Sequence, residues 1–510
     1  MSTRAYGFAL AAASGVLLAL SFPKFGYPPL AWIALAPLLV ALSQRVSLAR
    51  AFAFGVTTGA IYFGGTLYWM SGVMARYGEL NVAVAVLINA VFVAYVALFP
   101  ALFAVLMRRL TMVLGVGALP AAPFVWTATE LGRTHLFTGF PWVLLGYSQV
   151  TVLPIAQAAS IVGVFGVSAI VVSVSAAFAG LVIDRTFRAA VLVLVAVLLL
   201  AAWGNARVRG GALTREGEPL RVGLVQGNVL QEERDTPGRA SEILSRHLAM
   251  SHQAIEAGAT LVILPESALS PYTFDEFPVV AASWRDAARQ TAVSILLGSD
   301  QYQWRGFGRT REVEKSFNAA FMLRRDGTTG AVYRKIHLVP WGEYVPLKDW
   351  LTFVGPLVQA IGRGFDAGDE ATLLPVGTHR VSTAICYEII YPDLVRRFVR
   401  EGSELLTTIT NDSWFGPTSA PYQHFEQASM RAIEEGRYLV RAANTGVSGF
   451  VDPYGRVLER TAIYQPAVVV GDVRLLTAST VYSRTGDVFA YASAVASLAL
   501  VILSARRRVQ

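Results

Sequence analysis

The feature that most constrains this chain is a series of long apolar segments without any Asp, Glu, Lys or Arg. They span residues 51–75, 80–107, 110–129, 134–183, 189–206 and 488–505. Most supply the roughly 17–25 apolar residues that a helix needs to cross a bilayer. Two shorter apolar runs, 5–20 and 30–42, precede them. We therefore expect a multi-span α-helical membrane bundle of about seven spans in residues 1–209, and one further span near the C-terminus.

The charges are distributed unevenly along the chain. Residues 1–210 hold 12 Lys/Arg and 3 Asp/Glu, whereas residues 211–505 hold 28 and 32. An excess of basic residues beside apolar segments indicates membrane orientation rather than a nucleic-acid-binding face, so no nucleic-acid partner is expected. With the N-terminus inside, the inner loops hold ten Lys/Arg and the outer loops three. The positive-inside rule then places residues 210–485 outside the cytoplasm.

The block 210–485 has a different pattern from the apolar segments. Short β-type runs alternate there with helical patterns, of which residues 241–257 are one. The expected strands include residues 220–226, 260–264, 293–298, 319–323, 380–385, 405–410 and 446–451. Mixed strands and helices in one block predict an α/β sandwich. A C-terminal transmembrane helix with a basic tail then follows over residues 486–510.

A single cysteine, Cys386, gives the first indication of chemistry. It stands in Ser382-Thr-Ala-Ile-Cys-Tyr-Glu-Ile389, which is typical of a buried strand that ends at a sharp turn. Glu266 and Lys335 follow other predicted strands. A thiol, a carboxylate base and a fixed cation form a set suited to covalent acyl transfer. Each residue also has an ordinary interpretation, as a small buried hydrophobe, a helix-start carboxylate and a solvated cation.

Three motifs together resemble the Glu–Lys–Cys triad of the nitrilase superfamily. They are Leu264-Pro-Glu-Ser267, Tyr333-Arg-Lys-Ile-His-Leu-Val-Pro-Trp-Gly-Glu-Tyr-Val-Pro346 and Ile385-Cys-Tyr-Glu388. Their position between seven N-terminal spans and one C-terminal span resembles the apolipoprotein N-acyltransferase family over essentially the whole chain. The resemblance implies a nitrilase-like α-β-β-α sandwich. It also implies that Glu266 is the general base, Lys335 the oxyanion stabiliser and Cys386 the nucleophile.

The resemblance further implies supporting or substrate-binding roles for Glu343, Tyr387, Glu388, Asn411 and Trp414. The last two belong to Asn411-Asp-Ser-Trp-Phe-Gly416, which is similar to a family loop that lines the site. The apolar stretch 351–362 lies between Lys335 and Cys386 in the sequence. We expect it to form a lid that dips into the lipid surface, with a buried loop as the alternative.

Ordinary interpretations stay open for three of the supporting residues. Glu343 could orient the triad or only hydrogen-bond its own turn. Glu388 could pair with Arg437 or Arg441 as a structural ion pair. Trp414 could line the site or pack in the core.

The reaction implied by the resemblance is ping-pong acyl transfer. A phospholipid donates an acyl chain to Cys386 as a thioester, and the N-terminal amine of a diacylglyceryl-modified apolipoprotein then accepts it. The resemblance places the protein in the bacterial inner membrane, with its catalytic domain on the periplasmic side. The sequence shows neither a metal-ligand cluster nor a phosphate-binding loop, so no cofactor is expected. Two alternatives remain: a membrane-tethered nitrilase-type amidohydrolase, and a non-enzymatic transporter or scaffold with an inactive domain.

Overall fold

The structure is a computed structural model, and it describes residues 3–78, 80–185, 187–234, 236, 238–306, 311–346 and 364–506. The predicted lid, 351–362, lies outside these residues. The chain divides into two compact units. The first comprises Met1–Gly211, Thr418–Glu434 and Thr480–Gln510, and the second comprises Ala212–Pro417 and Glu435–Ser479. The chain therefore passes between the units four times.

The first unit is built of helices, and every apolar run noted in the sequence contributes to one of them. The helices are α1 (Thr3–Leu20), α2 (Pro28–Ala34), α3 (Ala36–Ser43), α4 (Leu48–Leu67), α5 (Trp69–Tyr77), α6 (Val82–Leu114), α7 (Ala122–His135), α8 (Leu153–Ala156), α9 (Ala159–Asp184), α10 (Phe187–Gly210), α16 (Ala420–Glu435), α17 (Val481–Thr485) and α18 (Val488–Arg506). Local sequence sets several boundaries. The Ser47 hydroxyl caps α4 and the Asn81 carboxamide caps α6, which ends at Gly115 with a positive φ.

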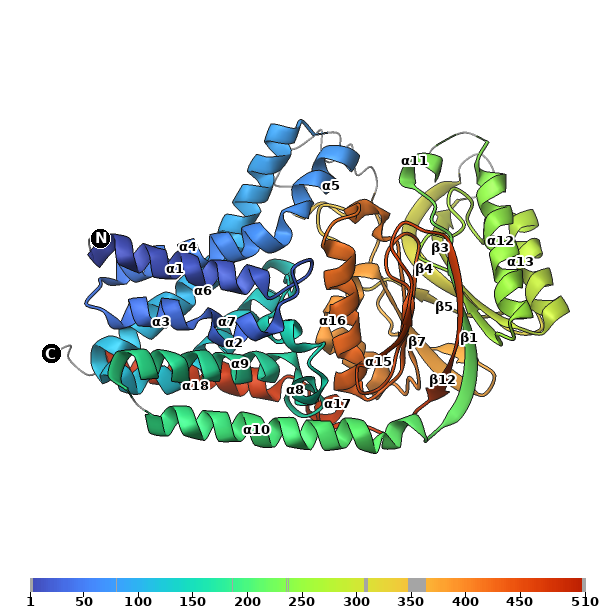
Figure 1. Ribbon diagram of the computed structural model, residues 1–510. Helices are drawn as coiled ribbons and strands as arrows, with labels where there is room; N and C mark the ends of the chain where they lie inside the picture. Colours follow the sequence, from blue (N-terminus) through green and yellow to red (C-terminus); the bar gives the residue numbers. More distant parts are fainter. Residues whose placement is uncertain are drawn as a thin grey trace. The chain divides into compact units, whose positions relative to one another are not determined.

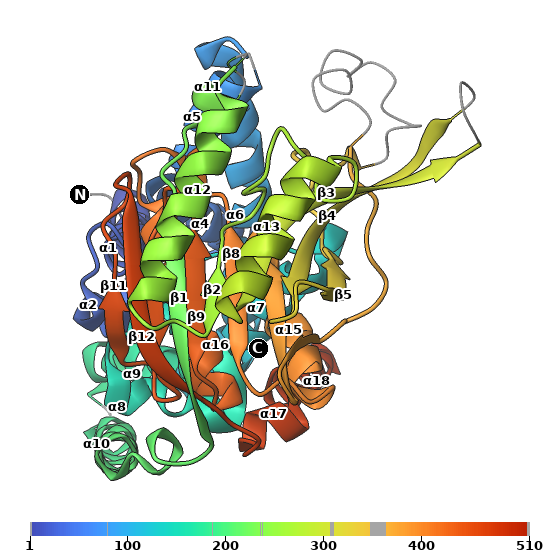
Figure 2. The same cartoon turned by 90° about the vertical axis from the view of Figure 1, so that its right-hand side faces the viewer.

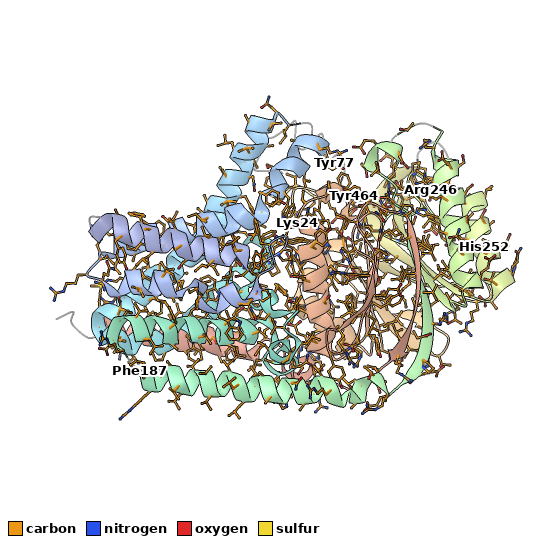
Figure 3. The ribbon with its side chains drawn as sticks, viewed as in Figure 1. Lys24, Tyr77, Phe187, Arg246, His252 and Tyr464 are labelled. Atoms are coloured by element: carbon orange, nitrogen blue, oxygen red, sulfur yellow. The ribbon has the colours of Figure 1, made fainter. Side chains whose placement is uncertain are left out.

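Four helical stretches of the described chain are long and apolar enough to cross a membrane. They are Val82–Thr138, Ala159–Asp184, Phe187–Thr214 and Val488–Arg506. The first of these contains both α6 and α7. Apolar side chains of α10 point outward along its length, and the labelled Phe187 marks its first turn (Figure 3). Leu192 and Leu199 on this helix are 70% and 66% exposed. Such a surface requires a lipid environment, so the chain is a membrane protein.

Helix α16 packs within the first unit through buried polar contacts. The Gln423 carboxamide donates to the carbonyl oxygens of Pro23 and Thr66 at 2.9 and 3.1 Å, and it accepts from the Trp142 indole at 2.8 Å. One residue before the end of the helix, the Glu434 carboxylate accepts a hydrogen bond from the Val164 N–H of α9 at 2.7 Å. These contacts fix α16 because each buried polar group would otherwise lose its partner.

The second unit contains two six-stranded sheets, with strand orders β12-β1-β2-β3-β4-β5 and β11-β10-β9-β8-β7-β6. The strands are β1 (Glu218–Gln226), β2 (Leu261–Ile263), β3 (Ser294–Arg305), β4 (Glu312–Leu323), β5 (Thr329–Arg334), β6 (Leu374–Val376), β7 (His379–Ile385), β8 (Leu406–Thr410), β9 (Leu439–Ala443), β10 (Gly449–Val451), β11 (Val457–Arg460) and β12 (Ala467–Leu475). Strands β1 to β3 are parallel, as are β7 to β9, and the other pairs are antiparallel.

The two sheets pack face to face, with helices on their outer sides. Strand β1 contacts β9, and β4 contacts β7. Helices α12 (Ala240–Glu256) and α13 (Pro278–Thr291) cover the first sheet (Figures 1 and 2), and α15 (Pro392–Arg400) contacts β7. Trp284 of α13 is fully buried against Phe321 and its neighbours on the sheet. This layer order confirms the predicted α-β-β-α sandwich.

Parallel strands bring the functional segments to one edge of the sandwich. Glu266 comes three residues after β2, Cys386 follows β7 directly, and Asn411 follows β8 directly. The carboxyl ends of parallel strands meet at the same edge, where side chains can converge. Lys335 follows β5 and reaches the same edge because its N–H continues the pairing with the carbonyl of Asn318 at 2.9 Å.

We expect Trp284→Ala to lower the free energy of unfolding by about 3–5 kcal/mol, because it removes a fully buried indole and leaves a cavity under α13. Equilibrium unfolding of the detergent-purified protein, followed by circular dichroism, measures this loss. Val279→Ala is the control, since Val279 lies on the first turn of the same helix and is 81% exposed. Equal unfolding midpoints for the two variants would contradict the assigned core.

Candidate active site

The site is organised around the turn that carries Cys386. Strand β7 ends at Ile385, and Cys386 opens the short helix η7 (Cys386–Ile390) with a φ of +53°. A left-handed backbone at a residue with a side chain costs of order 1–3 kcal/mol, so neighbouring contacts must hold it. Glu388 provides one of them, because its Oε2 accepts a hydrogen bond from the Ile385 N–H at 2.7 Å. The turn presents a thiol that is only 7% exposed.

The same carboxylate connects this turn to the segment that carries Lys335. Oε1 of Glu388 accepts hydrogen bonds from the Tyr333 hydroxyl and the Ile336 N–H, each at 2.7 Å, and from the His337 N–H at 3.0 Å. These three donors lie on both sides of Lys335 in the sequence. Burial raises the pKa of Glu388 to about 7, although its hydrogen bonds oppose that rise. Glu388 therefore fixes the position of the cation relative to the nucleophile.

The interpretation of Glu388 as an ion-pair partner of Arg437 or Arg441 is not supported. Arg441 pairs with Asp412 at 2.9 Å, and both side chains are fully buried. Arg437 donates from Nε to the carbonyl oxygen of Ser403 at 3.0 Å. The hydrogen bonds of Glu388 instead join two functional segments.

Lys335 lies between two carboxylates with 1% of its side chain exposed. Its Nζ is 2.8 Å from Oε1 of Glu343 and 3.6 Å from Oε1 of Glu266. Burial alone would lower the pKa of the ammonium group, but the Glu343 and Glu266 carboxylates outweigh burial and raise it above its ordinary value. Lys335 is therefore a permanent cation, suited to stabilising an oxyanion rather than to exchanging protons.

Glu266 reaches the site through a close approach of two backbone segments. A Cβ on Gly298 of β3 would lie 2.7 Å from the Glu266 Cα, so a side chain there would displace the loop. Two donors then orient the Glu266 carboxylate. Oε2 accepts from the Asn411 N–H and Oε1 from Nδ2 of Asn318, both at 2.7 Å. The carboxylate is 6% exposed and is held in one direction.

Asn318 is a site residue that the sequence interpretation missed. Its Nδ2 donates to Glu266 at 2.7 Å and to Glu343 at 3.0 Å, so one amide group joins the two carboxylates. The available signal was an asparagine inside an otherwise apolar β-type run, where a buried amide needs partners. Its partners could not be identified from the run itself.

Glu343 satisfies both interpretations that the sequence left open. Its Oε1 contacts Lys335 and Asn318, and its Oε2 accepts a hydrogen bond from the Val339 N–H of its own turn at 2.7 Å. The Val339 N–H therefore orients the Glu343 carboxylate, which in turn binds the Lys335 ammonium group.

The other predicted residues lie beside this centre. The Asn411 side chain accepts from the Ser413 hydroxyl at 2.8 Å and the Asn444 amide at 2.9 Å, so its contribution to Glu266 comes from its backbone. Trp414 is 39% exposed, which excludes the core interpretation. Tyr387 is 8% exposed, and its ring centroid lies 5.3 Å from that of Tyr391.

The electrostatics of the site keep the resting thiol protonated. Burial and then the Glu266 carboxylate raise the pKa of the Cys386 thiol well above its ordinary value, and the Lys335 ammonium opposes them only in part. Thiolate formation would therefore require a base, and the Glu266 carboxylate is close enough to affect the thiol pKa. Within the described residues, no group of three or more His, Cys, Asp or Glu side chains could hold a metal ion.

Sequence comparisons find two matching family profiles. Residues 14–177 match the apolipoprotein N-acyltransferase N-terminal domain, and residues 221–481 match carbon-nitrogen hydrolase. A protein named apolipoprotein N-acyltransferase from Geobacter metallireducens is 39% identical over 515 residues, covering 98% of this chain and 96% of that protein. One of the same name from Methylococcus capsulatus is 34% identical over 485 residues, covering 94% and 92%.

A mutant of the Nesterenkonia AN1 amidase from the nitrilase superfamily is similar to this chain with a TM-score of 0.40 and 19% sequence identity. The similarity covers 54% of this chain and 97% of that chain.

We expect alkylation of Cys386 by iodoacetamide to be slow at neutral pH. Because the pKa of the thiol is raised, the thiolate fraction should grow about tenfold per pH unit up to about pH 10, beyond the ordinary thiol pKa of roughly 8.5. Mass spectrometry measures the rate at the single cysteine. Lys335→Met should react more slowly at every pH, since it removes the opposing cation. A rate that levels off below about pH 8 would contradict this description.

We expect Glu388→Ala to lower the free energy of unfolding by about 3 kcal/mol or more, because several buried donors lose their acceptor. It should also change the alkylation rate of Cys386, since the nucleophile turn loses its support. Glu388→Gln, which keeps one acceptor oxygen, should show intermediate stability. Thermal unfolding and alkylation rates test both statements. The exposed Glu401→Ala is the control, and identical behaviour of Glu388→Ala and Glu401→Ala would refute the role of Glu388.

Proposed function

Because the chain belongs to the apolipoprotein N-acyltransferase family, we propose that it moves a fatty acyl chain from a phospholipid to the N-terminal amine of a diacylglyceryl-cysteine apolipoprotein. The observation that carries this proposal is the convergence of Glu266, Lys335 and Cys386 at one buried edge of the sandwich. A thiol with its own base and a fixed cation can form and resolve an acyl thioester. Glu266 is the general base, Lys335 the oxyanion stabiliser and Cys386 the nucleophile.

The first half of the reaction forms the acyl-enzyme. Glu266 takes the proton of the Cys386 thiol as the sulfur forms a bond to the ester carbonyl carbon of the phospholipid. The Lys335 ammonium balances the negative charge that develops on the carbonyl oxygen, and the backbone N–H of Tyr387 assists it. The ester C–O bond then breaks, and the proton on Glu266 passes to the departing glycerol oxygen. A lysophospholipid leaves, and the acyl chain remains on sulfur.

The second half transfers the acyl chain to nitrogen. The neutral amine of the acceptor attacks the thioester carbon while Glu266 accepts one amine proton, and Lys335 again balances the oxyanion. The C–S bond breaks as the amide C–N bond is retained, and Glu266 returns the proton to the Cys386 thiolate. Base and nucleophile end in their starting protonation states, as a ping-pong cycle requires.

The membrane part explains how both substrates reach one thiol. The acyl donor and the acceptor are both anchored by lipid chains, so the reaction must take place where lipid has access. The distribution of Lys and Arg in the loops supports a multi-pass protein of the bacterial inner membrane with its catalytic domain on the periplasmic side. In this proposal Glu343, Glu388, Asn411 and Asn318 position the triad, and Tyr387 and Trp414 contact the substrate.

Mass spectrometry of the protein incubated with phospholipid alone tests the proposal. We expect a hydroxylamine-labile fatty acyl adduct on Cys386 that persists until a diacylated lipopeptide is added and then appears on the lipopeptide amine. Cys386→Ala should form no adduct. Glu266→Gln should form it at least about a hundredfold more slowly, as expected for the loss of a general base. Rapid release of free fatty acid without an acceptor would instead identify an amidohydrolase-type enzyme. Full transfer by Cys386→Ala would remove the proposal.

A further inference from the structure

A cavity of about 770 Å³ lies on the hairpin of β3 and β4, within the second unit. Figure 2 shows this yellow hairpin extending beyond the rest of its sheet. The lining of the cavity includes Tyr302, Trp304, Arg311, Val313, Ser316 and Phe365. Aromatic rings therefore form much of the wall, with a cation at its margin. The triad mechanism uses none of these residues.

Strand register connects this cavity to the catalytic carboxylates. Asp300 pairs across the hairpin with Asn318, and Tyr302 pairs with Ser316. Alternate residues of a strand share one face, so these side chains form a continuous row on one side of the hairpin. Asn318 stands at one end of the row and contacts Glu266. The row therefore runs along the hairpin from Asn318 to the lining of the cavity, where the Ser316 hydroxyl donates to the Gly364 carbonyl oxygen at 2.8 Å.

The row continues to the outer part of the hairpin. A register shift after Gln303 places Trp304 opposite Val313, and both residues line the cavity together with Tyr302. The distance along β4 from Asn318 to Val313 is about 17 Å at the usual rise per strand residue. That length matches four or five residues of an extended polypeptide.

The aromatic wall is held in place before any ligand binds. The Trp304 indole N–H donates to Glu276 at 2.7 Å, and Nη2 of Arg311 lies 3.2 Å from each oxygen of the same carboxylate. The Arg311 guanidinium also lies over the Trp304 ring, 4.1 Å from its centroid. A ring fixed in this way loses little conformational freedom on binding. Large rigid aromatic surfaces also contact many different side chains without requiring one sequence.

We propose that the cavity and the row of side chains leading to it, together called the groove, bind the first residues of the acceptor polypeptide. These are the residues that follow its acylated N-terminal cysteine. The inference rests on the proposed function and specifies where its acceptor lies. A phospholipid headgroup is too short to extend from beside the triad to the aromatic wall, whereas an extended polypeptide of about five residues can span that distance. The margin carries both signs of charge, at Arg311 and Glu312, which suits a chain of varied sequence. Binding along the groove draws the acceptor amine toward Glu266.

Steady-state kinetics with two acceptors test this inference. One is a dipalmitoylated cysteine amide without further residues, and the other is a dipalmitoylated lipopeptide of six residues. We expect Trp304→Ala to raise the KM for the lipopeptide about tenfold, as for the loss of an aromatic contact at an interface. The KM for the cysteine amide and the rate of acyl-enzyme formation from phospholipid should stay within about twofold of wild type. Trp304→Phe should restore most of the difference.

Phe277→Ala is the matched control, because Phe277 is a 42% exposed aromatic residue of the same unit that does not line the cavity. It should leave both KM values unchanged. The inference is overturned if wild type has equal KM values for the two acceptors. It is also overturned if Trp304→Ala raises both KM values equally or slows acyl-enzyme formation instead. If wild type forms no acyl-enzyme, the proposed function fails first, and the two failures are therefore distinguishable.

Discussion

The ammonium group of Lys335, buried between Glu343 and Glu266 at 2.8 and 3.6 Å, sets the charge state of the whole site. Two neighbouring carboxylates would repel each other in a low-dielectric interior, and the single cation together with the Asn318 amide compensates them. A fourth charge, the Cys386 thiolate, finds too little compensation, so the thiol stays neutral. When the sulfur attacks a carbonyl group, the negative charge moves from sulfur to the carbonyl oxygen, where the Lys335 ammonium group can stabilise it. Under the proposed function, the thiolate would then form only when substrate is present.

Glu388 gives this charge arrangement its geometry. A buried carboxylate with donors from two segments acts as a rigid connection, because releasing any donor leaves a polar group unpaired. It holds both the left-handed backbone at Cys386 and the segment around Lys335. The connecting carboxylate belongs to Glu388, two residues after Cys386, so these structural hydrogen bonds do not involve the thiol. The left-handed backbone at Cys386 is thus supported by a hydrogen bond from the Ile385 N–H to Glu388.

The local sequence pattern predicted that Glu266, Lys335 and Cys386 stand at strand ends, and the structure places them there. Glu266, Lys335 and Cys386 each follow a β-type run, and strand ends of a sandwich converge at one edge whatever the details of packing. Asn318 was not predictable in the same way, because its contacts depend on the register of β4 against β5 and on the close approach of the Glu266 loop at Gly298. The contribution of Asn411 was hidden for another reason. Its bond to Glu266 comes from a backbone N–H, which every residue other than proline carries.

Helix α16 follows the Asn411 loop in the chain, yet it belongs to the helical unit, where Gln423 hydrogen-bonds with Pro23, Thr66 and Trp142. If residues 212–479 were expressed as a separate fragment, α16 would be removed from these hydrogen-bond partners. The buried Gln423 and Glu434 side chains of α16 would then be exposed to solvent, together with the apolar residues around them. Residues 418–434 belong to the helical unit but lie between two segments of the second unit in the sequence. The two units therefore cannot be exchanged between proteins by cutting the chain at a single linker.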